Sequence, residues 1–481
     1  MLNHLNNHFN ETRTTNGAQA FKSTNSAVLD LFSQGGAMRN HSDNDIVSLF
    51  SKAYAENSTL AMKTLFYLRD IQFGQGERKF FRLALNYLAI HNKDSLVKNL
   101  HLVPEFGRWD DLWVLLETSV KDDVIHLVYN QLTVDVQSEN PSLLAKWMPS
   151  ENASSYKTKQ YAKIIREGVK TSPKKYRKLL SALRAKINLV ETKLTEKKYD
   201  EIDYSKIPSV AGMVYRGAFF RNDEMRYRKF LDSLEKGEVK VNAGTLYPSD
   251  IVGKILGKWH VEDREVKLFE GQWNNLPNFI GEKTENSLVM ADVSGSMSGT
   301  PMNVSIALAM YIAERNKGIF KDYFMTFSTK PSMVKIQGSN IVDKVNNISR
   351  ADWDMSTNIE SALQTILDVA VKNKLSNDEV VKKLYIISDM QFDSCTRGAS
   401  VGAFENMKNK FNDFGYDMPN ITFWNVNAYG NQPMTMNEQG VQLVSGYSPS
   451  ILTQLLNNDG KTPYDFMLEV IDSERYKEVT A

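Results

Sequence analysis

The stretch LVMADVSGSMSGTP, residues 288–301, joins an apolar run to a cluster of oxygen-bearing side chains, after which a helical pattern begins. The run LVMA predicts a buried strand. Asp292, Ser294 and Ser296 follow it on a loop with the spacing Asp-x-Ser-x-Ser. A carboxylate and two hydroxyls are hard oxygen ligands, which suit Mg²⁺ or Mn²⁺ and are poor ligands for zinc. We therefore expect a divalent-cation site on this strand-to-helix loop.

Two positions further along the chain can complete that site. Thr357 lies in DMSTNI, and Asp389 ends the apolar run KKLYIISD. Both are predicted at the carboxyl edge of the same sheet, where functional residues of such sheets gather. Thr357 also forms a Thr-x-x-Glu capping pattern with Glu360, and Asp389 can simply end a strand. The candidate metal ligands are therefore Asp292, Ser294, Ser296, Thr357 and Asp389.

Short apolar runs and helical stretches alternate around these residues, from 286 to 445. The predicted strands are NSLVMADVS, DYFMTFS, SMVKIQG, KKLYIISDM, NITFWNVNA and VQLVSGY. Alternation of this kind predicts an α/β doubly wound sheet with helices on both faces. Residues 446–481 are expected to form C-terminal helices that can pack back on the preceding part of the chain.

Residues 26–285 show helical spacing throughout and predict an α-helical repeat domain, HEAT-like and able to close into a ring. Residues 1–25 are expected to be a flexible N-terminus. One predicted helix begins at Pro173 with Ser172 as its N-cap. Its apolar face is formed by Tyr176, Leu180, Leu183, Ile187 and Leu194. The aromatic residues Phe106, Trp109 and Trp113 are likewise assigned to the core.

The Asp-x-Ser-x-Ser motif, with Thr357 and Asp389, resembles the metal-ion-dependent adhesion site (MIDAS) of a von Willebrand factor A domain. The resemblance covers residues 286–445. It implies that Ser294, Ser296 and Thr357 offer hydroxyl oxygens, while Asp292 and Asp389 contribute directly or through water. One coordination position would then remain for water or for a carboxylate of a partner.

A von Willebrand A domain behind a long helical array resembles the Ro ribonucleoprotein class, the TROVE architecture. The chain is also similar to a family of largely uncharacterised proteins that have the same layout. The stretches that carry this similarity are RDIQFGQGERKFFR, PEFGRWDDLW, LLAKWMPSEN, KKYRKLLSALRAKI, AFFRND and NAGTLYPSDIV. The Ro resemblance implies a ring of helical repeats closed by the von Willebrand A domain, and an RNA partner.

Charge is unevenly distributed along the chain. The formal net charge is only +1, yet residues 156–186 hold eleven basic side chains against the single acid Glu167. Stripes of this kind neutralise phosphates, although lysine-rich helix faces can also be merely solvated. Tyr156, Tyr161 and Phe220 could serve as stacking platforms for unpaired bases. The candidate RNA-binding residues are Lys157, Lys159, Lys163, Lys174, Lys175, Arg177, Lys178, Arg184 and Lys186.

Composition narrows the remaining function classes. The one cysteine, Cys395, excludes a disulfide framework and suits a reducing compartment. No signal peptide or membrane span is evident, so we expect a cytoplasmic protein, and a monomer is favoured. All seven histidines precede the metal motif, and no nucleophile–base pair is visible near it. We expect no enzymatic activity.

Two functional hypotheses follow. The first is a non-enzymatic, Ro-like RNA-binding protein that holds single-stranded or structured RNA on a basic helical surface and carries a Mg²⁺ site. The second is a protein–protein interaction adaptor whose metal site captures an acidic residue of a partner. A metal-dependent hydrolase is a remote third reading because the general base is missing.

Overall fold

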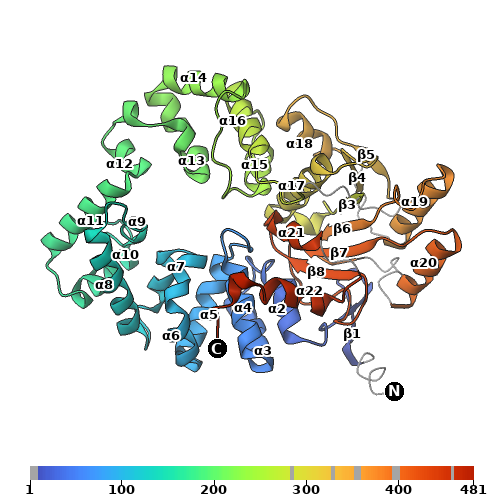
Figure 1. Ribbon diagram of the computed structural model, residues 1–481, viewed down its shortest axis with the longest axis horizontal. Coiled ribbons are helices and arrows are strands. Elements are labelled where there is room, and N and C mark those ends of the chain that lie inside the picture. Colours follow the sequence, from blue (N-terminus) through green and yellow to red (C-terminus); the bar gives the residue numbers. More distant parts are fainter. Residues whose placement is uncertain (1–8, 282–285, 327–330, 352–358, 393–400, 457–459) are drawn as a thin grey trace.

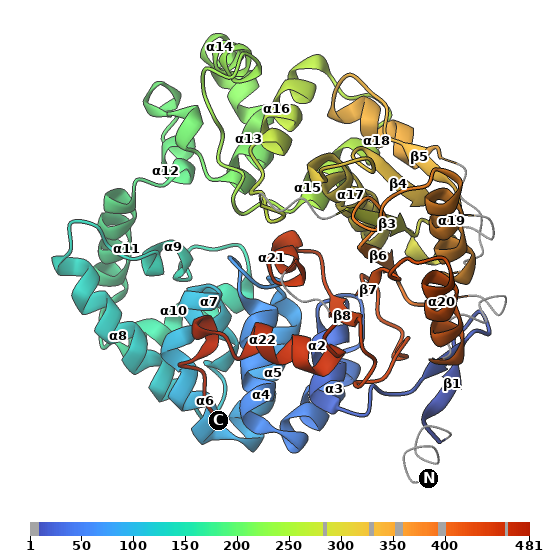
Figure 2. The same ribbon diagram turned by 45° about the vertical axis from the view of Figure 1, so that its right-hand side comes forward.

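The computed structural model describes residues 9–281, 286–326, 331–351, 359–392, 401–456 and 460–481. The N-terminal part is mostly helical, and the C-terminal part is built on a six-stranded sheet. In Figure 1 the helices follow one another around an arc, and the sheet part lies between the two ends of that arc. Figure 2 shows the same ring-like arrangement after a turn about the vertical axis.

The arc consists of short and medium-length helices, which run in chain order. These are α2 (Ala27–Gly35), α3 (Asp43–Glu56), α4 (Ser58–Arg69), α5 (Arg78–His91), α6 (Lys93–Asn99), η1 (Leu100–Leu102), α7 (Val103–Phe106), η2 (Trp109–Leu115), α8 (Lys121–Gln137), α9 (Leu144–Trp147), α10 (Tyr156–Gly168), α11 (Pro173–Ile187), α12 (Val190–Thr195), η3 (Tyr199–Glu201), η4 (Tyr204–Lys206), α13 (Ser209–Asn222), α14 (Glu224–Glu235), α15 (Pro248–Leu256) and α16 (Asp263–Asn274).

The helix expected from Pro173 is present but shorter than its apolar pattern predicts. Ser172 caps α11 by accepting a hydrogen bond from the backbone N–H of Lys175. The helix ends at Ile187 because Asn188 adopts a left-handed conformation, with φ of 56°. Leu194 therefore belongs to α12 and joins a second, smaller hydrophobic cluster. Its inclusion on the α11 face was wrong.

The sheet has the order β5-β4-β3-β6-β7-β8, and its strands lie in the six apolar runs expected. Its strands are β3 (Ser287–Ala291), β4 (Tyr323–Thr326), β5 (Met333–Lys335), β6 (Lys383–Ser388), β7 (Asn420–Asn425) and β8 (Val441–Ser445). Only the β4–β5 pair is antiparallel. The chain proceeds from β3 outward on one side and from β6 outward on the other, so the two central strands flank a topological switch point.

Helices cover both faces of the sheet (Figures 1 and 2). α17 (Thr300–Arg315) lies on one side, and α19 (Ile359–Lys372) and α20 (Val401–Asp413) lie on the other. The remaining elements are η5 (Gly295–Met297), α18 (Ile341–Ser349), η7 (Pro449–Ile451), α21 (Leu452–Leu455), α22 (Pro463–Ile471) and η8 (Glu474–Tyr476).

Both ends of the helical arc pack on the sheet part. At one end, α2 contacts β8, where the Ser445 hydroxyl donates to the carbonyl of Phe32 at 2.8 Å. At the other end, α15 packs on α17 and α18. The C-terminal helix α22 contacts α2 and α4. Beyond it, the Arg475 guanidinium donates to the fully buried carboxylate of Asp70 at 2.9 Å.

The segment expected to be a flexible N-terminus is ordered in its described portion. β1 (Glu11–Arg13) and β2 (Gln19–Phe21) form an antiparallel hairpin. Long-range hydrogen bonds hold this hairpin in place: the Thr14 hydroxyl donates to the carbonyl of Phe392 at 2.6 Å, and the backbone N–H of Thr15 donates to the Gln391 side chain at 2.8 Å. This docking could not be predicted from the weakly hydrophobic N-terminal segment, because the contacts are polar and their partners come from the distant sheet part.

Across the described residues, no helix combines the length and the apolar character needed to cross a lipid bilayer.

Candidate nucleic-acid interface and candidate metal site

The basic segment 156–186 folds into two successive helices, α10 and α11, whose apolar faces pack inward. Ala162 and Ile165 are buried on α10, and Tyr176, Leu180 and Leu183 are buried on α11. Five lysines on the remaining turns are exposed, and within the described residues no ion pair or hydrogen bond of their side chains is found. We name these five the lysine surface: Lys159, Lys163, Lys174, Lys175 and Lys178.

The other four predicted RNA contacts are engaged within the protein. Lys157 forms an ion pair with Glu117, and Arg177 pairs with Glu151 at 2.9 Å. The remaining two hold backbone carbonyls: Arg184 donates to Ala145 and Met148 at 2.8 Å, and Lys186 donates to Val136 at 3.2 Å and Ser138 at 2.9 Å. The sequence pattern predicts helical faces correctly, but it cannot distinguish a cation that is free from one that caps a neighbouring helix.

The three aromatic residues considered as stacking platforms lie in different surroundings. Tyr156 is largely exposed at the start of α10, and Tyr161 is half-buried one turn later. Phe220 is buried, with the Arg264 guanidinium 4.3 Å from its ring centre. Only Tyr156 and Tyr161 therefore lie on the helix that also carries part of the lysine surface.

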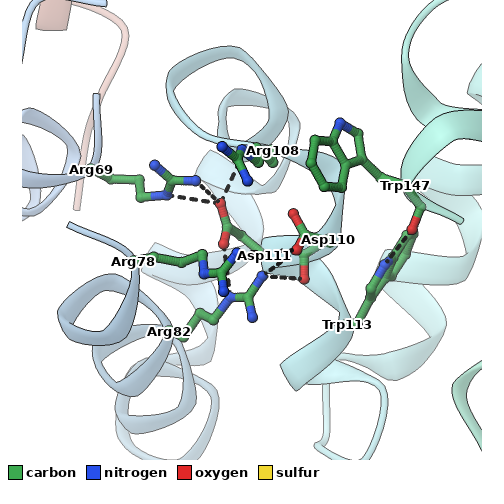
Figure 3. A network of polar contacts seen from close by, with 8 residues as sticks. All are labelled: Arg69, Arg78, Arg82, Arg108, Asp110, Asp111, Trp113 and Trp147. Carbon is green, nitrogen blue, oxygen red and sulfur yellow. Dashed lines mark hydrogen bonds and ion pairs between the residues drawn. The ribbon is translucent and has the colours of Figure 1, made fainter. Parts of the chain in front are cut away.

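Figure 3 shows an arginine–aspartate network beside this region. The Asp111 carboxylate has no exposed surface and accepts from Arg69 Nε and Arg82 Nε, both at 2.8 Å. It also accepts from the backbone N–H of Arg108 at 3.0 Å. A buried carboxylate held by two guanidinium groups and an amide is fully satisfied. Asp111 is therefore structural and joins α4, α5 and η2.

Its neighbour Asp110 is only partly satisfied. Asp110 Oδ2 accepts from Arg82 Nη2 at 2.7 Å, while Asp110 Oδ1 is buried without a hydrogen-bond partner among the described residues. On the other side, the Arg108 guanidinium lies 4.7 Å from the Trp147 ring centre (Figure 3). Burial, with the nearby charge of Arg69, lowers the pKa of Arg108. Positive charge is thus concentrated here, next to one free carboxylate oxygen.

A pocket of about 890 Å³ opens between α5, η2 and the four helices α9, α10, α11 and α12, and we name it the α9–α12 pocket. Trp113, which is otherwise core as expected, forms part of its wall together with Trp147 and Tyr161. Among the nine predicted RNA contacts, Lys157 and Arg184 line this pocket. Sequence reasoning missed the other charged lining residues because they come from segments far apart in the chain: Arg82, Asp110, Lys146, Glu191 and Glu196.

The metal-motif residues gather where β3 and β6 end. Asp292 and Asp389 follow these neighbouring strands, and both are almost completely buried. Asp292 Oδ1 accepts from the backbone N–H of Ser294 at 2.8 Å, and the Ser294 and Ser296 hydroxyl oxygens are 3.1 Å apart. Thr357, the fifth predicted ligand, lies outside the described residues. Sequence reasoning did not include Ser388, whose hydroxyl donates to Asp292 Oδ2 at 2.9 Å.

The electrostatics of this loop cluster suit a cation. Burial, reinforced by the charge of Asp389, raises the pKa of Asp292 to about 6. Burial likewise raises the pKa of Asp389, whose Oδ2 atom is buried and has no hydrogen-bond partner in the part of the chain that the structure describes. No cluster of three or more His, Cys, Asp or Glu side chains suited to a metal occurs in the part of the chain described. A cation at this loop would therefore need the serine hydroxyls as well as the two carboxylates, and oxygen ligands of this kind fit Mg²⁺.

Comparison with known proteins places the chain in a family. A family model described as "Domain of unknown function (DUF2828)" matches residues 14–142 and 142–285, more than half of the chain. The chain belongs to this family. A second model, "Domain of unknown function (DUF7788)", matches residues 286–479 of the same chain.

The chain also resembles individual proteins over nearly its whole length. It is 31% identical over 502 aligned residues to "Uncharacterized protein L728" of Acanthamoeba polyphaga mimivirus, an alignment covering 95% of this chain and 87% of that protein. Among solved structures, the crystal structure of the Deinococcus radiodurans RO (RSR) protein matches with a TM-score of 0.48 and 13% identity, covering 95% of this chain and all of that one.

Proposed function

We propose that this protein is a non-enzymatic RNA-binding protein of the cytoplasm, active as a monomer. Its lysine surface attracts the phosphates of single-stranded or structured RNA. The observation that carries the proposal is the state of these five lysines, which are exposed on two consecutive helices and have no acidic partner among the described contacts. The Ro-like layout read from the sequence motifs supports the same kind of ligand.

The energetics of such a surface are those of counterion release. Each lysine that neutralises a phosphate of single-stranded nucleic acid contributes about 0.7 to the slope of log affinity against log salt concentration. If all five lysines contact phosphates, their removal lowers that slope by about 3.5. Binding at low salt should therefore be largely independent of sequence and should weaken steeply as salt is added.

The test is fluorescence anisotropy of the full chain with a labelled 20-nucleotide single-stranded RNA, titrated at several NaCl concentrations. The test variant replaces all five residues of the lysine surface by glutamine. The control replaces five other exposed lysines by glutamine: Lys52, Lys236, Lys240, Lys372 and Lys374. We expect the salt slope to fall in the first variant and to change little in the control. Equal slopes in the two variants, or no binding by the wild type at low salt, would overturn the proposal.

We further propose that the loops after β3 and β6 bind Mg²⁺ or Mn²⁺ in the manner of a MIDAS, through Asp292, Ser294, Ser296, Thr357 and Asp389. The unpartnered Asp389 oxygen and the raised pKa of Asp292 support a bound cation.

The same two features of the loop cluster also favour a second function, an adaptor whose bound cation captures an acidic side chain of a partner protein. Partner capture that is lost on EDTA treatment and in Asp292→Ala would support the adaptor. RNA binding that is unchanged by EDTA would separate the two activities.

A further inference from the structure

The segment TSPKK, residues 171–175, lies between the two helices of the lysine surface and contains the start of α11. Ser172, Pro173, Lys174 and Lys175 are all exposed. In Figures 1 and 2, α11 lies at the outer edge of the helical arc, away from the sheet part. Another protein can therefore reach this segment from solvent.

The order of residues in this segment matches the substrate pattern of a proline-directed protein kinase. Such kinases phosphorylate a serine or threonine that precedes a proline, and many also select a basic residue at the third following position, because a negatively charged group of the kinase pairs with it. Serine or threonine precedes proline at four places in the chain: Ser172, Thr300, Ser448 and Thr462. Only Ser172 has a basic residue, Lys175, at that third position, since the other three sites have Asn303, Ile451 and Asp465 there.

The backbone at Ser172 suits a kinase cleft, which binds its substrate in an extended form. Ser172 is itself extended, with φ of −80° and ψ of 155°. Its hydroxyl oxygen accepts a long hydrogen bond, 3.4 Å, from the backbone N–H of Lys175. The first turn of a helix opens at small cost because its N–H groups have no partners within the helix. The Ser172 hydroxyl is therefore available as a phosphate acceptor.

A phosphate group on Ser172 lies among the cations that are proposed to hold RNA. Three of the five residues of the lysine surface follow Ser172 on the first two turns of α11: Lys174, Lys175 and Lys178. Lys175 is the third residue after the N-cap, a position from which a side chain reaches back to the N-cap. Lys178 neighbours Lys175 on the helix surface. Because phosphoserine carries about 1.5 to 2 negative charges at pH 7, it neutralises about two of these lysines and repels the phosphates of RNA.

We propose that Ser172 is a phosphorylation site for a proline-directed protein kinase, and that its phosphorylation weakens RNA binding by the lysine surface. The kinase transfers the γ-phosphoryl group of ATP. The bond from Ser172 Oγ to phosphorus forms, the bond from that phosphorus to the oxygen retained by ADP breaks, and the hydroxyl proton passes to a base of the kinase. The effect on RNA binding rests on the proposed function, whereas the modification itself does not.

The size of the effect follows from counterion release. Each lysine that contacts a phosphate of single-stranded nucleic acid contributes about 0.7 to the slope of log affinity against log salt concentration. Neutralising about two contacts lowers that slope by about 1.4 and the affinity at 0.1 M NaCl by roughly 25-fold relative to 1 M NaCl. A single added negative charge should lower the slope by about 0.7 and the affinity by roughly fivefold.

The binding experiment uses the full chain and the labelled 20-nucleotide RNA, with anisotropy at several NaCl concentrations. Ser172→Asn and Ser172→Asp are a matched pair, because both new side chains cap helices well and they differ by one charge. Full chain with phosphoserine incorporated at position 172 during translation provides the next step in charge. We expect Ser172→Asn to bind like the wild type, and the salt slope to fall in Ser172→Asp and further in the phosphorylated protein.

The control pair is Ser42→Asn and Ser42→Asp, at the exposed N-cap of α3, which does not belong to the lysine surface. These two variants should give equal salt slopes. Thermal unfolding shows whether each variant is folded. A slope that changes as much between the Ser42 variants as between the Ser172 variants would overturn the local effect of the phosphate.

The modification is tested with a purified cyclin-dependent kinase and ATP, followed by mass spectrometry. The substrates are the folded wild type, Ser172→Asn and a synthetic peptide of residues 166–180. Phosphate on Ser172 of the folded wild type is the expected result. A folded wild type that stays unmodified at Ser172 would overturn the site, and the peptide then shows whether the sequence or the folded structure excludes the kinase.

The outcomes for Ser172 and for the lysine surface are distinguishable. If the wild type binds RNA with a steep salt slope that Ser172→Asp and the phosphoserine protein leave unchanged, the regulatory inference fails and the proposed function stands. If the wild type does not bind RNA at low salt, the proposed function and the regulation fail together, while the kinase assay still decides the modification.

Discussion

Replacing Asp292 by asparagine should stabilise the protein when divalent cations are removed. In the folded protein burial and the charge of Asp389 raise the pKa of Asp292 from its ordinary value of 3.8 to about 6. A difference of about 2 pKa units corresponds to roughly 3 kcal/mol of unfavourable free energy for the ionised group. Asparagine carries no charge, so the variant avoids this cost while its amide oxygen can still accept from the backbone N–H of Ser294.

The sign of this effect fixes its dependence on pH. Because the folded state binds the Asp292 proton more tightly than the unfolded state does, the wild type is progressively destabilised as pH rises from about 4 to 6, and the loss is complete above pH 6. In EDTA the variant should therefore be more stable than the wild type at pH 7.5 by up to about 3 kcal/mol, and nearly equal to it below pH 4.

Urea unfolding followed by tryptophan fluorescence, in EDTA and in 10 mM MgCl₂, measures both states. Magnesium should stabilise the wild type at pH 7.5, since a ligand that binds only the folded state adds free energy by mass action, and it should not stabilise the variant. Asp368→Asn, at an exposed position of α19, is the control for loss of one charge. A variant less stable than the wild type in EDTA at pH 7.5, or an equal magnesium effect in both proteins, would refute the reasoning.

Two further substitutions test how the parts of the ring are held together. Asp111→Ala leaves the buried guanidinium of Arg69 without its carboxylate and should lower the free energy of unfolding by roughly 3 to 5 kcal/mol in urea titrations; a loss below 1 kcal/mol would contradict the structural role of Asp111. Gly36→Ala would place a methyl group 2.6 Å from the backbone oxygen of Ser445 and should destabilise the contact of α2 with β8 by about 1 to 3 kcal/mol. Gly244→Ala, where the added carbon meets nothing within 4 Å, should be nearly neutral, so equal losses at the two glycines would argue against tight packing at α2.

Local patterns in the sequence predict much of the fold. The six apolar runs after residue 286 contain the six strands, since alternating strand and helix signals depend only on neighbouring residues. The same is true of the start of α11, where Ser172 caps the helix. Its end was not predictable, because the apolar spacing continues through Leu194 while Asn188 breaks the helix through its backbone conformation.

The two candidate sites also differ in how far the sequence predicts them. Asp292, Ser294 and Ser296 lie within five residues of one another, so their spacing alone indicates a cation site, and the termination of parallel strands at one edge adds Asp389. The α9–α12 pocket has no such local signal: Asp110, Lys157 and Glu191 are far apart in the chain, and only the packing of η2, α10 and α12 brings them together.

Sequence alone determined which faces of the helices are apolar and which are basic, because that depends on spacing along one helix. Tertiary structure alone decided which cations are free and which carboxylate oxygens lack a donor, because each hydrogen-bond partner is supplied by another segment of the chain.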